Sequence, residues 1–375
     1  MKYMGSKRWM LKNGLGRIIL AESANAGQFI DLFTGSSAVA RFAAQNASIP
    51  VCAFDLQAYA AILARAVIMR TNVANAQNIW TAWMRRAKEC ARPEFPNWTD
   101  KPTQKTVEAV RAWCSRRRGR PITQAYGGHY FSPEQAIWID ALRLTLPESE
   151  PNRSLALAAL LEAASECAAS PGHTAQPLQP TKEAKPFLFE AWKRDVLKRT
   201  KKALERIAAA HAKRLGYAKV ANANEVARLL TENDLVFIDS PYSGVHYSRF
   251  YHVLETIAVG HCGEVFGTGR YPDETQRPRS LYSVQSESEM AMDDLLETIA
   301  STGARAILTY PDGECSNGLS GADLEEIAHD YFHIDALIIE SRFSTLGGTK
   351  TETGGGYGRA ARQLAGEMIL VLTPK

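Results

Sequence analysis

The stretch that decides the fold is Leu235-Val-Phe-Ile-Asp239-Ser240-Pro241-Tyr242, in which an apolar run stops abruptly at an acid, a proline and an aromatic ring. An uninterrupted apolar run predicts a strand buried on both faces, because half-solvated strands alternate between apolar and polar residues. In open α/β sheets, ligands bind at the carboxyl ends of the strands. Asp and Pro also end ordinary strands, since both form turns. The stretch therefore predicts either a functional site or a simple turn at the end of a buried strand.

Two earlier apolar segments end in a comparable way. Residues 28–37 read as a short strand that runs into small residues and then into an Ala-rich helix, and residues 51–56 read as a second strand that ends in Asp55. Small residues between a strand and a helix let a ligand approach the free amides at the helix N-terminus. An acid after the second strand, about twenty residues on, is typical of sites that bind ribose hydroxyls. The spacing predicts an adenosine-containing cofactor.

The composition is that of a folded protein with one large domain and an insertion, or with two domains. The chain has 375 residues, of which 45% are hydrophobic and 22% charged, and its net charge of +4 is too small to indicate nucleic-acid binding by itself. The charge is unevenly distributed, however. Residues 182–219 contain twelve Lys or Arg and four acids, a net of +8, and a second basic cluster covers residues 116–120. These clusters favour a phosphate-contacting surface over a merely solvated helix face.

The strand signals vanish between about residues 72 and 217, where helical patterns are joined by proline-containing loops. We therefore expect an inserted, mainly helical and basic domain at 72–217, and a second domain made of residues 1–71 and 218–375. Further strands are expected at residues 218–224, 304–310, 334–339 and 368–372. The last two are expected to pair as an antiparallel hairpin. The predicted fold class is α/β, with helices on both faces of the sheet.

The cysteines and the hydropathy indicate a cytoplasmic protein with no membrane association. The six cysteines are scattered, without a CxxC pair or a His spacing that makes a zinc site, and this favours reduced thiols and no metal centre. The N-terminus carries no signal-peptide h-region, and the most apolar later run, residues 155–161, is far too short to cross a bilayer.

Taken together, these segments resemble the Dam-like DNA adenine methyltransferases over most of the chain outside the insertion. The resemblance rests on five motifs in the family's order: Tyr3-Met-Gly5-Ser-Lys7, the glycine-containing turn within residues 29–39, Asp55, Asp239-Ser-Pro-Tyr242 and Phe343-Ser-Thr-Leu-Gly-Gly348-Thr. It implies a Rossmann-like methyltransferase sheet with an inserted target-recognition domain. It also implies S-adenosylmethionine as the cofactor and double-stranded DNA as the substrate.

The resemblance assigns roles to individual residues. The catalytic residues it implies are Asp239, Ser240, Pro241 and Tyr242. The cofactor-binding residues it implies are Tyr3, Lys7, Asp31, Phe33, Gly35, Ser36, Asp55 and Asn222. Within this set, Lys7 would contact the methionine part of the cofactor and Asp55 the ribose. The DNA-binding residues that we expect from the basic clusters and from the segment after the catalytic motif are Arg116, Arg117, Arg118, Arg120, Lys198, Arg199, Lys201, Lys202, Tyr247 and Arg249.

The implied reaction is methyl transfer to the exocyclic amine of an adenine that is flipped out of the duplex. That nitrogen is a poor nucleophile because its lone pair is delocalised into the ring. If the Asp239 carboxylate and the Ser240 carbonyl accept its two protons, the lone pair points at the methyl donor while Tyr242 stacks on the base.

The sequence departs from the family's pattern in two places. Ser240 replaces the first proline of the Asp-Pro-Pro-Tyr motif, and the third strand offers Asn222 and Asn224 where family members often carry an acid. Two alternatives stay open: a catalytically silent DNA-binding homologue, and the same chemistry on RNA or on the cytosine amine. The sequence also leaves open the recognition site, the oligomeric state and a cognate restriction endonuclease.

Overall fold

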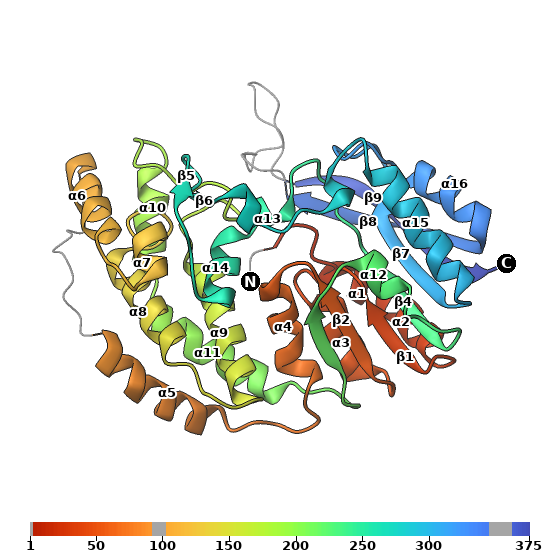
Figure 1. Ribbon diagram of the computed structural model, residues 1–375, viewed down its shortest axis with the longest axis horizontal. Coiled ribbons are helices and arrows are strands. Elements are labelled where there is room, and N and C mark those ends of the chain that lie inside the picture. The colour runs from red at the N-terminus through yellow and green to blue at the C-terminus, as the bar shows by residue number, and fades with distance from the viewer. Residues whose placement is uncertain (1–2, 92–102, 345–361) are drawn as a thin grey trace. The chain divides into compact units, whose positions relative to one another are not determined.

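The computed structural model describes residues 3–91, 103–344 and 362–375, and it divides the chain into two compact units (Figure 1). The sheet unit comprises Met4–Asn72, His211–Tyr247 and Arg279–Lys375. The helical unit comprises Met1–Tyr3, Val73–Ala210 and Ser248–Pro278.

A seven-stranded sheet forms the centre of the sheet unit. Its strands are β1 (Gln28–Asp31), β2 (Val51–Asp55), β3 (Tyr217–Val220), β4 (Asp234–Ile238), β7 (Arg305–Pro311), β8 (Phe332–Ser344) and β9 (Arg362–Pro374). They lie in the order β3-β2-β1-β4-β7-β9-β8. The first five are parallel, and β9 is antiparallel to both of its neighbours. This topology confirms the predicted α/β class and the terminal antiparallel hairpin.

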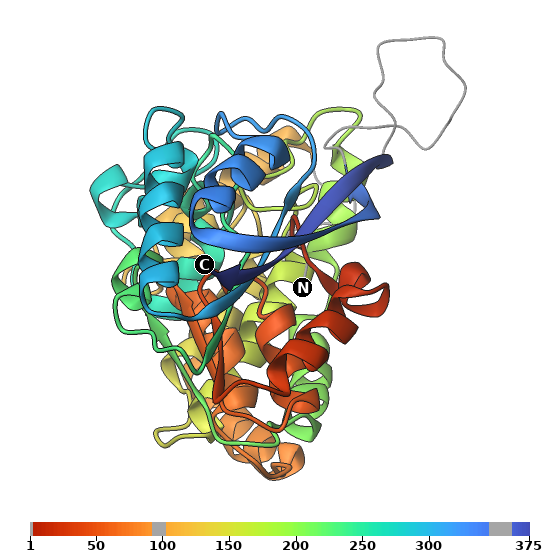
Figure 2. The same ribbon diagram turned by 90° about the vertical axis from the view of Figure 1, so that its right-hand side faces the viewer.

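Helices cover both faces of the sheet (Figures 1 and 2). They are α1 (Arg8–Lys12), α2 (Leu15–Ser23), α3 (Ala38–Asn46), α4 (Ala58–Ile68), α12 (Ala223–Ala227), α15 (Ser288–Ser301) and α16 (Gly321–Tyr331). Helices α1 to α4 contact one another on one face, and α12, α15 and α16 do so on the other. Two short 3-10 helices, Glu274–Gln276 and Leu281–Ser283, precede α15.

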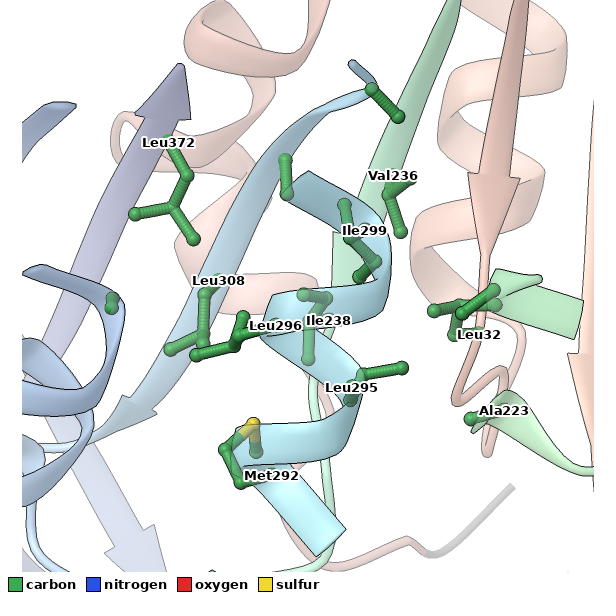
Figure 3. Packing of buried hydrophobic residues seen from close by; sticks show 14 of the residues in the cluster. Leu32, Ala223, Val236, Ile238, Met292, Leu295, Leu296, Ile299, Leu308 and Leu372 are labelled. Atoms are coloured by element: carbon green, nitrogen blue, oxygen red, sulfur yellow. The ribbon is translucent and has the colours of Figure 1, made fainter. Parts of the chain in front are cut away.

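The core of the sheet unit explains why the apolar run of β4 forms its central strand. Every residue of β4 is buried, and Val236 and Ile238 face one side of the sheet together with Leu308 of β7. Leu295 and Leu296 of α15 pack onto this surface (Figure 3). Each such side chain contributes about 1.5–3 kcal/mol to folding on burial. The run at residues 235–238 therefore sets both the strand and the direction in which the following acid leaves the sheet.

The helical unit contains α5 (Ala76–Ala91), α6 (Gln104–Ser115), α7 (Pro121–Tyr126), α8 (Pro133–Leu144), α9 (Asn152–Cys167), α10 (Lys185–Trp192), α11 (Val196–Ala209) and α14 (His252–Val259). A small hairpin joins β5 (Val265–Phe266) to β6 (Tyr271–Pro272), and α13 (Tyr247–Phe250) begins where the chain passes from one unit to the other. The basic segment is two helices, because Asp195 caps α11 by accepting a hydrogen bond from the Lys198 amide.

The units differ from the predicted segments in extent. Residues 248–278 belong to the helical unit, because α14 packs against α7 and α9. The Tyr126 hydroxyl lies 2.9 Å from the Thr256 hydroxyl, and Arg143 donates hydrogen bonds to the Ile257 and Ala258 carbonyls. These contacts join residues more than a hundred positions apart, so no local sequence pattern predicts them.

The third strand is also shorter than the sequence predicts. It ends at Val220, because the Asn222 side chain accepts a hydrogen bond from the Asn224 amide and starts α12 there.

Two further observations concern the chain as a whole. All six cysteines lie in the described part of the chain, and all are free. Within that part, no helix combines the length and the apolar character that a membrane span needs.

Candidate active site

Three acids follow the carboxyl ends of three adjacent parallel strands. Asp31 ends β1, Asp55 ends β2, and Asp239 comes directly after β4. Strand β1 lies between β2 and β4, with Asp31 in register with Phe237 and Ala53. Because the carboxyl ends of parallel strands meet at one edge of the sheet, the three carboxyl groups gather at that edge.

A buried lysine joins Asp239 to the far end of the chain. The Nζ atom of Lys7 lies 3.0 Å from Asp239 Oδ1 and 3.0 Å from Glu367 Oε2 of β9. The Lys7 and Glu367 side chains are each only 3% exposed, whereas that of Asp239 is 19% exposed. Thr309 of β7 also donates a hydrogen bond to Asp239 Oδ1. Asp239 is thus fixed on one side and open to a ligand on the other.

The charges of this cluster set the protonation state of Asp239. Burial raises the pKa of Asp239 to about 6, and the nearby Lys7 ammonium opposes that rise. Burial alone would lower the pKa of Lys7, but the Asp239 and Glu367 carboxylates outweigh it and raise that pKa above its ordinary value. Lys7 therefore remains a cation, and Asp239 is mostly ionised at neutral pH.

The ring of Tyr242 is placed by close packing around the turn. It meets the Tyr310 ring edge to face at 6.3 Å and the Tyr247 ring at 6.4 Å between centroids. Gly5 is needed beneath it, because a β-carbon there would lie 2.6 Å from the Tyr242 hydroxyl, and because Gly5 has a φ of +69°. The glycine of the N-terminal motif thus makes room for the aromatic residue of the Asp239-Ser-Pro-Tyr242 motif.

The turn after β1 and the acid after β2 support each other. The Gly35 amide donates a hydrogen bond to Asp55 Oδ2 at 2.8 Å, and the Gln57 amide donates one to Asp55 Oδ1 at 2.9 Å. Gly35 and Ser37 both have left-handed backbone angles, with φ of 48° and 57°. Burial raises the pKa of Asp55 to about 6, and these hydrogen bonds oppose the rise.

Asp31 is the most buried acid of the edge. It is 1% exposed, and its Oδ1 has no hydrogen-bond partner among the residues that the structure describes. Burial, with the nearby Asp239 and Asp55 carboxylates, raises the pKa of Asp31 to about 8. A buried acid with an unused oxygen is an unsatisfied group that a cationic ligand would stabilise.

These features suit S-adenosylmethionine, which carries a sulfonium, an ammonium group and ribose hydroxyls. The acids at the edge complement its positive charges, and Asp55 can still accept hydroxyl hydrogen bonds because each carboxylate oxygen accepts more than one. The Gln57 side chain is buried, and within the described chain neither its Nε2 nor its Oε1 has a partner. Sequence reasoning missed Gln57, and its only local signal is its position two residues after Asp55.

The other residues that the sequence predicts to bind the cofactor are divided between the two units. The Phe33 ring meets the Tyr282 ring edge to face at 5.0 Å, and the Ser36 hydroxyl lies 3.5 Å from that of Ser6. Tyr3 belongs to the helical unit, where it stacks on Tyr251 with ring centroids 4.6 Å apart. As described above, Asn222 caps a helix, whereas its neighbour Asn224 bridges Tyr282 and Asp294.

The basic residues expected to bind DNA divide into paired and exposed groups. On α11, Arg199 pairs with Glu166 at 2.6 Å and Lys201 lies 4.0 Å from Glu205, whereas Lys198 and Lys202 are exposed.

The second basic cluster divides in the same way. Arg117 lies over the Trp113 ring and Arg120 donates to the Cys90 carbonyl, whereas Arg116 and Arg118 are exposed. After the turn at residues 239–242, Arg249 lies over the Tyr271 ring in the helical unit. Of the residues expected to bind DNA, each cluster thus contributes two exposed cations.

Sequence reasoning missed two residues that contact Asp239 or its partner. Glu367 is a lone acid just before the apolar run of β9, and Thr309 lies within the apolar strand β7. Nothing in the local sequence distinguishes either from an ordinary strand residue. The last of the five motifs, residues 343–349, lies mostly outside the described residues.

Three methyltransferases are similar in sequence to this chain. The chain is 25% identical over 317 residues to the modification methylase LlaI of Lactococcus lactis subsp. lactis, which is 80% of this chain and 44% of that protein. It is 30% identical over 117 residues to the modification methylase StsI of Streptococcus sanguinis, covering 31% of this chain and 17% of that protein. Over 78 residues it is 40% identical to the type II methyltransferase M.FokI of Planomicrobium okeanokoites, covering 20% of this chain and 12% of that protein.

The matched part of this chain thus spans less than half the length of each of these relatives. The family model for D12 class N6 adenine-specific DNA methyltransferases matches residues 3–268, which include Lys7, the three acids and the turn at residues 239–242. The chain belongs to the D12 class N6 adenine-specific DNA methyltransferase family.

Proposed function

We propose that this chain transfers a methyl group from S-adenosylmethionine to the exocyclic amine of adenine at specific sites in double-stranded DNA. The observation that carries the proposal is the Asp239 carboxylate, which is paired with the buried Lys7 and followed by Ser240, Pro241 and Tyr242. Family membership and the names of the relatives support the choice of base and of nucleic acid. A cognate restriction endonuclease is proposed as its partner in the cytoplasm, because these relatives include modification methylases.

The proposed chemistry needs two hydrogen-bond acceptors and one aromatic surface. Asp239 accepts a hydrogen bond from one N–H of the amine and the Ser240 carbonyl accepts a hydrogen bond from the other, so that the nitrogen lone pair is localised and aimed at the methyl group. Bound S-adenosylmethionine supplies an electrophilic methyl group on a sulfonium. Asp239 then stabilises the positive charge that develops on the nitrogen, and the surplus proton leaves towards it. Tyr242 stacks on the base, which offsets part of the cost of flipping it out of the duplex.

Lys7 and Glu367 control Asp239 in opposite directions. The Lys7 ammonium favours the ionised carboxylate, which is the form able to accept an amine proton. The Glu367 carboxylate raises the pKa of Asp239 and also retains Lys7 at its position. We infer that the pair keeps Asp239 ionised at neutral pH and still basic enough to take up the surplus proton.

Asp31 is proposed to recognise the positive charge of the cofactor. With a pKa of about 8, its carboxyl group is mostly protonated at neutral pH in the absence of a cation. Binding of a cation beside it favours the ionised form and so releases the proton. The affinity for the cofactor should therefore increase as the pH rises towards about 8.

The central test replaces Asp239 with alanine. Asp239→Ala should reduce methyl transfer on the order of 10²- to 10⁴-fold, because the amine loses its charged acceptor. Transfer is measured with isotopically labelled S-adenosylmethionine and duplex DNA, and mass analysis of nucleosides identifies the modified base. Cofactor binding should remain, since Asp31 and Asp55 are unchanged. A variant as active as the unmodified chain, or a product other than N6-methyladenine, contradicts the proposal.

The pH dependence of activity gives a second test, in which two substitutions should shift the acidic limb of the profile in opposite directions. Activity should fall as the pH drops through about 6, since protonated Asp239 no longer accepts the amine proton. Lys7→Met removes the cation that lowers this pKa, so the acidic limb should move up by about one pH unit or more. Glu367→Gln removes a carboxylate that raises it, so the limb should move down. Profiles of kcat against pH that shift in the same direction in both variants would rule out this account.

Calorimetry can detect the proton that Asp31 is expected to release. At pH 7, binding of S-adenosylmethionine should release about one proton, measured as the dependence of the binding enthalpy on buffer ionisation. Asp31→Asn should weaken binding and abolish the release. The matched control is Asp234→Asn, which changes a buried acid at the opposite end of β4. If the control loses the proton and the Asp31 variant keeps it, the cation is recognised elsewhere.

The role of α11 in DNA binding can be tested with two matched pairs of substitutions. Lys198→Ala with Lys202→Ala removes two exposed cations, and Arg199→Ala with Lys201→Ala removes two that are paired with acids. Each phosphate contact contributes about 0.9 to the slope of log K against log salt. The first pair should therefore flatten the slope by about 2 and the second by much less. Equal slopes in the unmodified chain and in both variants would make α11 a solvated helix only.

A further inference from the structure

The turn that carries Asp239 is contacted by the loop that follows β7. Asn317 of this loop is 1% exposed. Its Nδ2 donates hydrogen bonds to the Pro241 carbonyl at 3.1 Å and to the Tyr282 carbonyl at 3.0 Å. Its Oδ1 accepts one from the Tyr310 hydroxyl at 2.9 Å and a longer one from the Leu319 amide at 3.4 Å. Both donors and the acceptor of this buried amide are therefore in use.

A second contact lies three residues further along the same turn. The Gly244 amide donates a hydrogen bond to the Ser316 hydroxyl at 3.0 Å. A β-carbon at Gly244 would lie 2.4 Å from the Ser316 carbonyl oxygen, so only glycine allows the two backbones this close. Consecutive residues of one loop thus contact both Pro241 and Gly244.

The loop itself is well supported. The Cys315 amide donates to the Leu319 carbonyl at 2.9 Å, and the Gly318 amide donates to the Cys315 carbonyl at 3.0 Å. The Ser288 hydroxyl at the start of α15 donates to the Asn317 carbonyl at 2.9 Å. A loop closed on itself and bonded to a helix offers a rigid support for the turn.

The position of Ser240 gives this support a function. A proline at 240 would fix its own φ near −65°, and serine does not. Pro241 restricts the ψ of Ser240, because the ring clashes with helical conformations of the preceding residue. The direction of the Ser240 carbonyl then depends on the φ of Ser240 and on the placement of the next peptide. Asn317 determines that placement by bonding the Pro241 carbonyl.

We propose that Asn317, assisted by Ser316, is a positioning residue that aims the Ser240 carbonyl at the target amine and so replaces the restraint of the missing proline. The inference rests on the proposed methyl transfer. It explains how a turn with one proline can keep the geometry for which the Asp-Pro-Pro-Tyr pattern uses two. It also predicts that a proline at position 240 can compensate for the loss of the hydrogen bond from Asn317 to the Pro241 carbonyl.

The test is a cycle of two substitutions. Asn317→Asp keeps the size of the side chain and the acceptor for Tyr310, but removes the donor to the Pro241 and Tyr282 carbonyls. It should lower kcat on the order of 10- to 100-fold and change the KM for the cofactor by less than about twofold. Ser240→Pro in the unmodified chain supplies the reference kcat for the cycle. Ser240→Pro in the Asn317→Asp background should restore kcat to within about threefold of the Ser240→Pro single variant.

Two further variants separate positioning from folding. Ser316→Ala removes an exposed hydroxyl and should lower kcat a few-fold without changing the melting temperature. Gln135→Ala removes a buried amide of the helical unit that also donates to two carbonyls, those of Ala191 and Arg194. Gln135→Ala should lower the melting temperature, and adding Ser240→Pro should restore neither the melting temperature nor kcat. If Ser240→Pro rescues the Gln135 variant as well, or fails to rescue the Asn317 variant, the inference is overturned.

Hydrogen exchange supplies a readout that does not need turnover. The amides of Tyr242 and Gly244 should exchange faster in Asn317→Asp and return towards the original rate when Ser240→Pro is added. Unchanged exchange in Asn317→Asp overturns the inference, and so does a gain in kcat above about tenfold from Ser240→Pro alone. If the variants show this exchange pattern but the unmodified chain methylates no DNA, the positioning role is supported and the proposed function is refuted.

Discussion

One buried ammonium group connects the three parts of the chain that make the site. Lys7 lies near the start of the chain, Asp239 after its central strand and Glu367 in its last strand, and the three meet within hydrogen-bond distance. A buried cation is costly unless it is paired, so the Asp239 and Glu367 carboxylates stabilise Lys7 at this position. The ion pair with Lys7, together with the hydrogen bond from Thr309, holds Asp239 Oδ1 against the protein. The Asp239 side chain nevertheless stays 19% exposed, so a ligand can still reach it.

The sequence carries the parts of this arrangement that depend on local order. The apolar run before Asp239 predicted β4, because a strand buried on both faces needs no polar alternation. The acid after β2 and the small residues after β1 were placed correctly at the sheet edge, since a short turn leaves few alternatives. The antiparallel pairing of the last two strands was predictable as well. Long-range pairing was not: nothing around Glu367 or Asn317 distinguishes these residues from ordinary strand or loop residues.

The helical unit shows the same limit. Its basic segment was visible as charge, but the partners that neutralise Arg199 and Lys201 lie on α9 and one helical turn further along α11. Counting charges cannot separate a cation that faces an acid from one that faces solvent. The extension of this unit to Pro278 was equally hidden, because α14 follows the catalytic turn without a break and joins the unit only by packing against helices far earlier in the chain.

The place of β9 in the sheet has a consequence for the order of folding. β9 lies between β7 and β8, so β8 reaches the sheet only through a strand that is synthesised after it. Glu367 arrives with that strand. Until it docks, Lys7 can form at most one of its two ion pairs, and the contacts involved are among the longest in sequence separation that the chain makes. During synthesis, the charge balance around Asp239 is therefore completed only after all five parallel strands of the sheet have emerged.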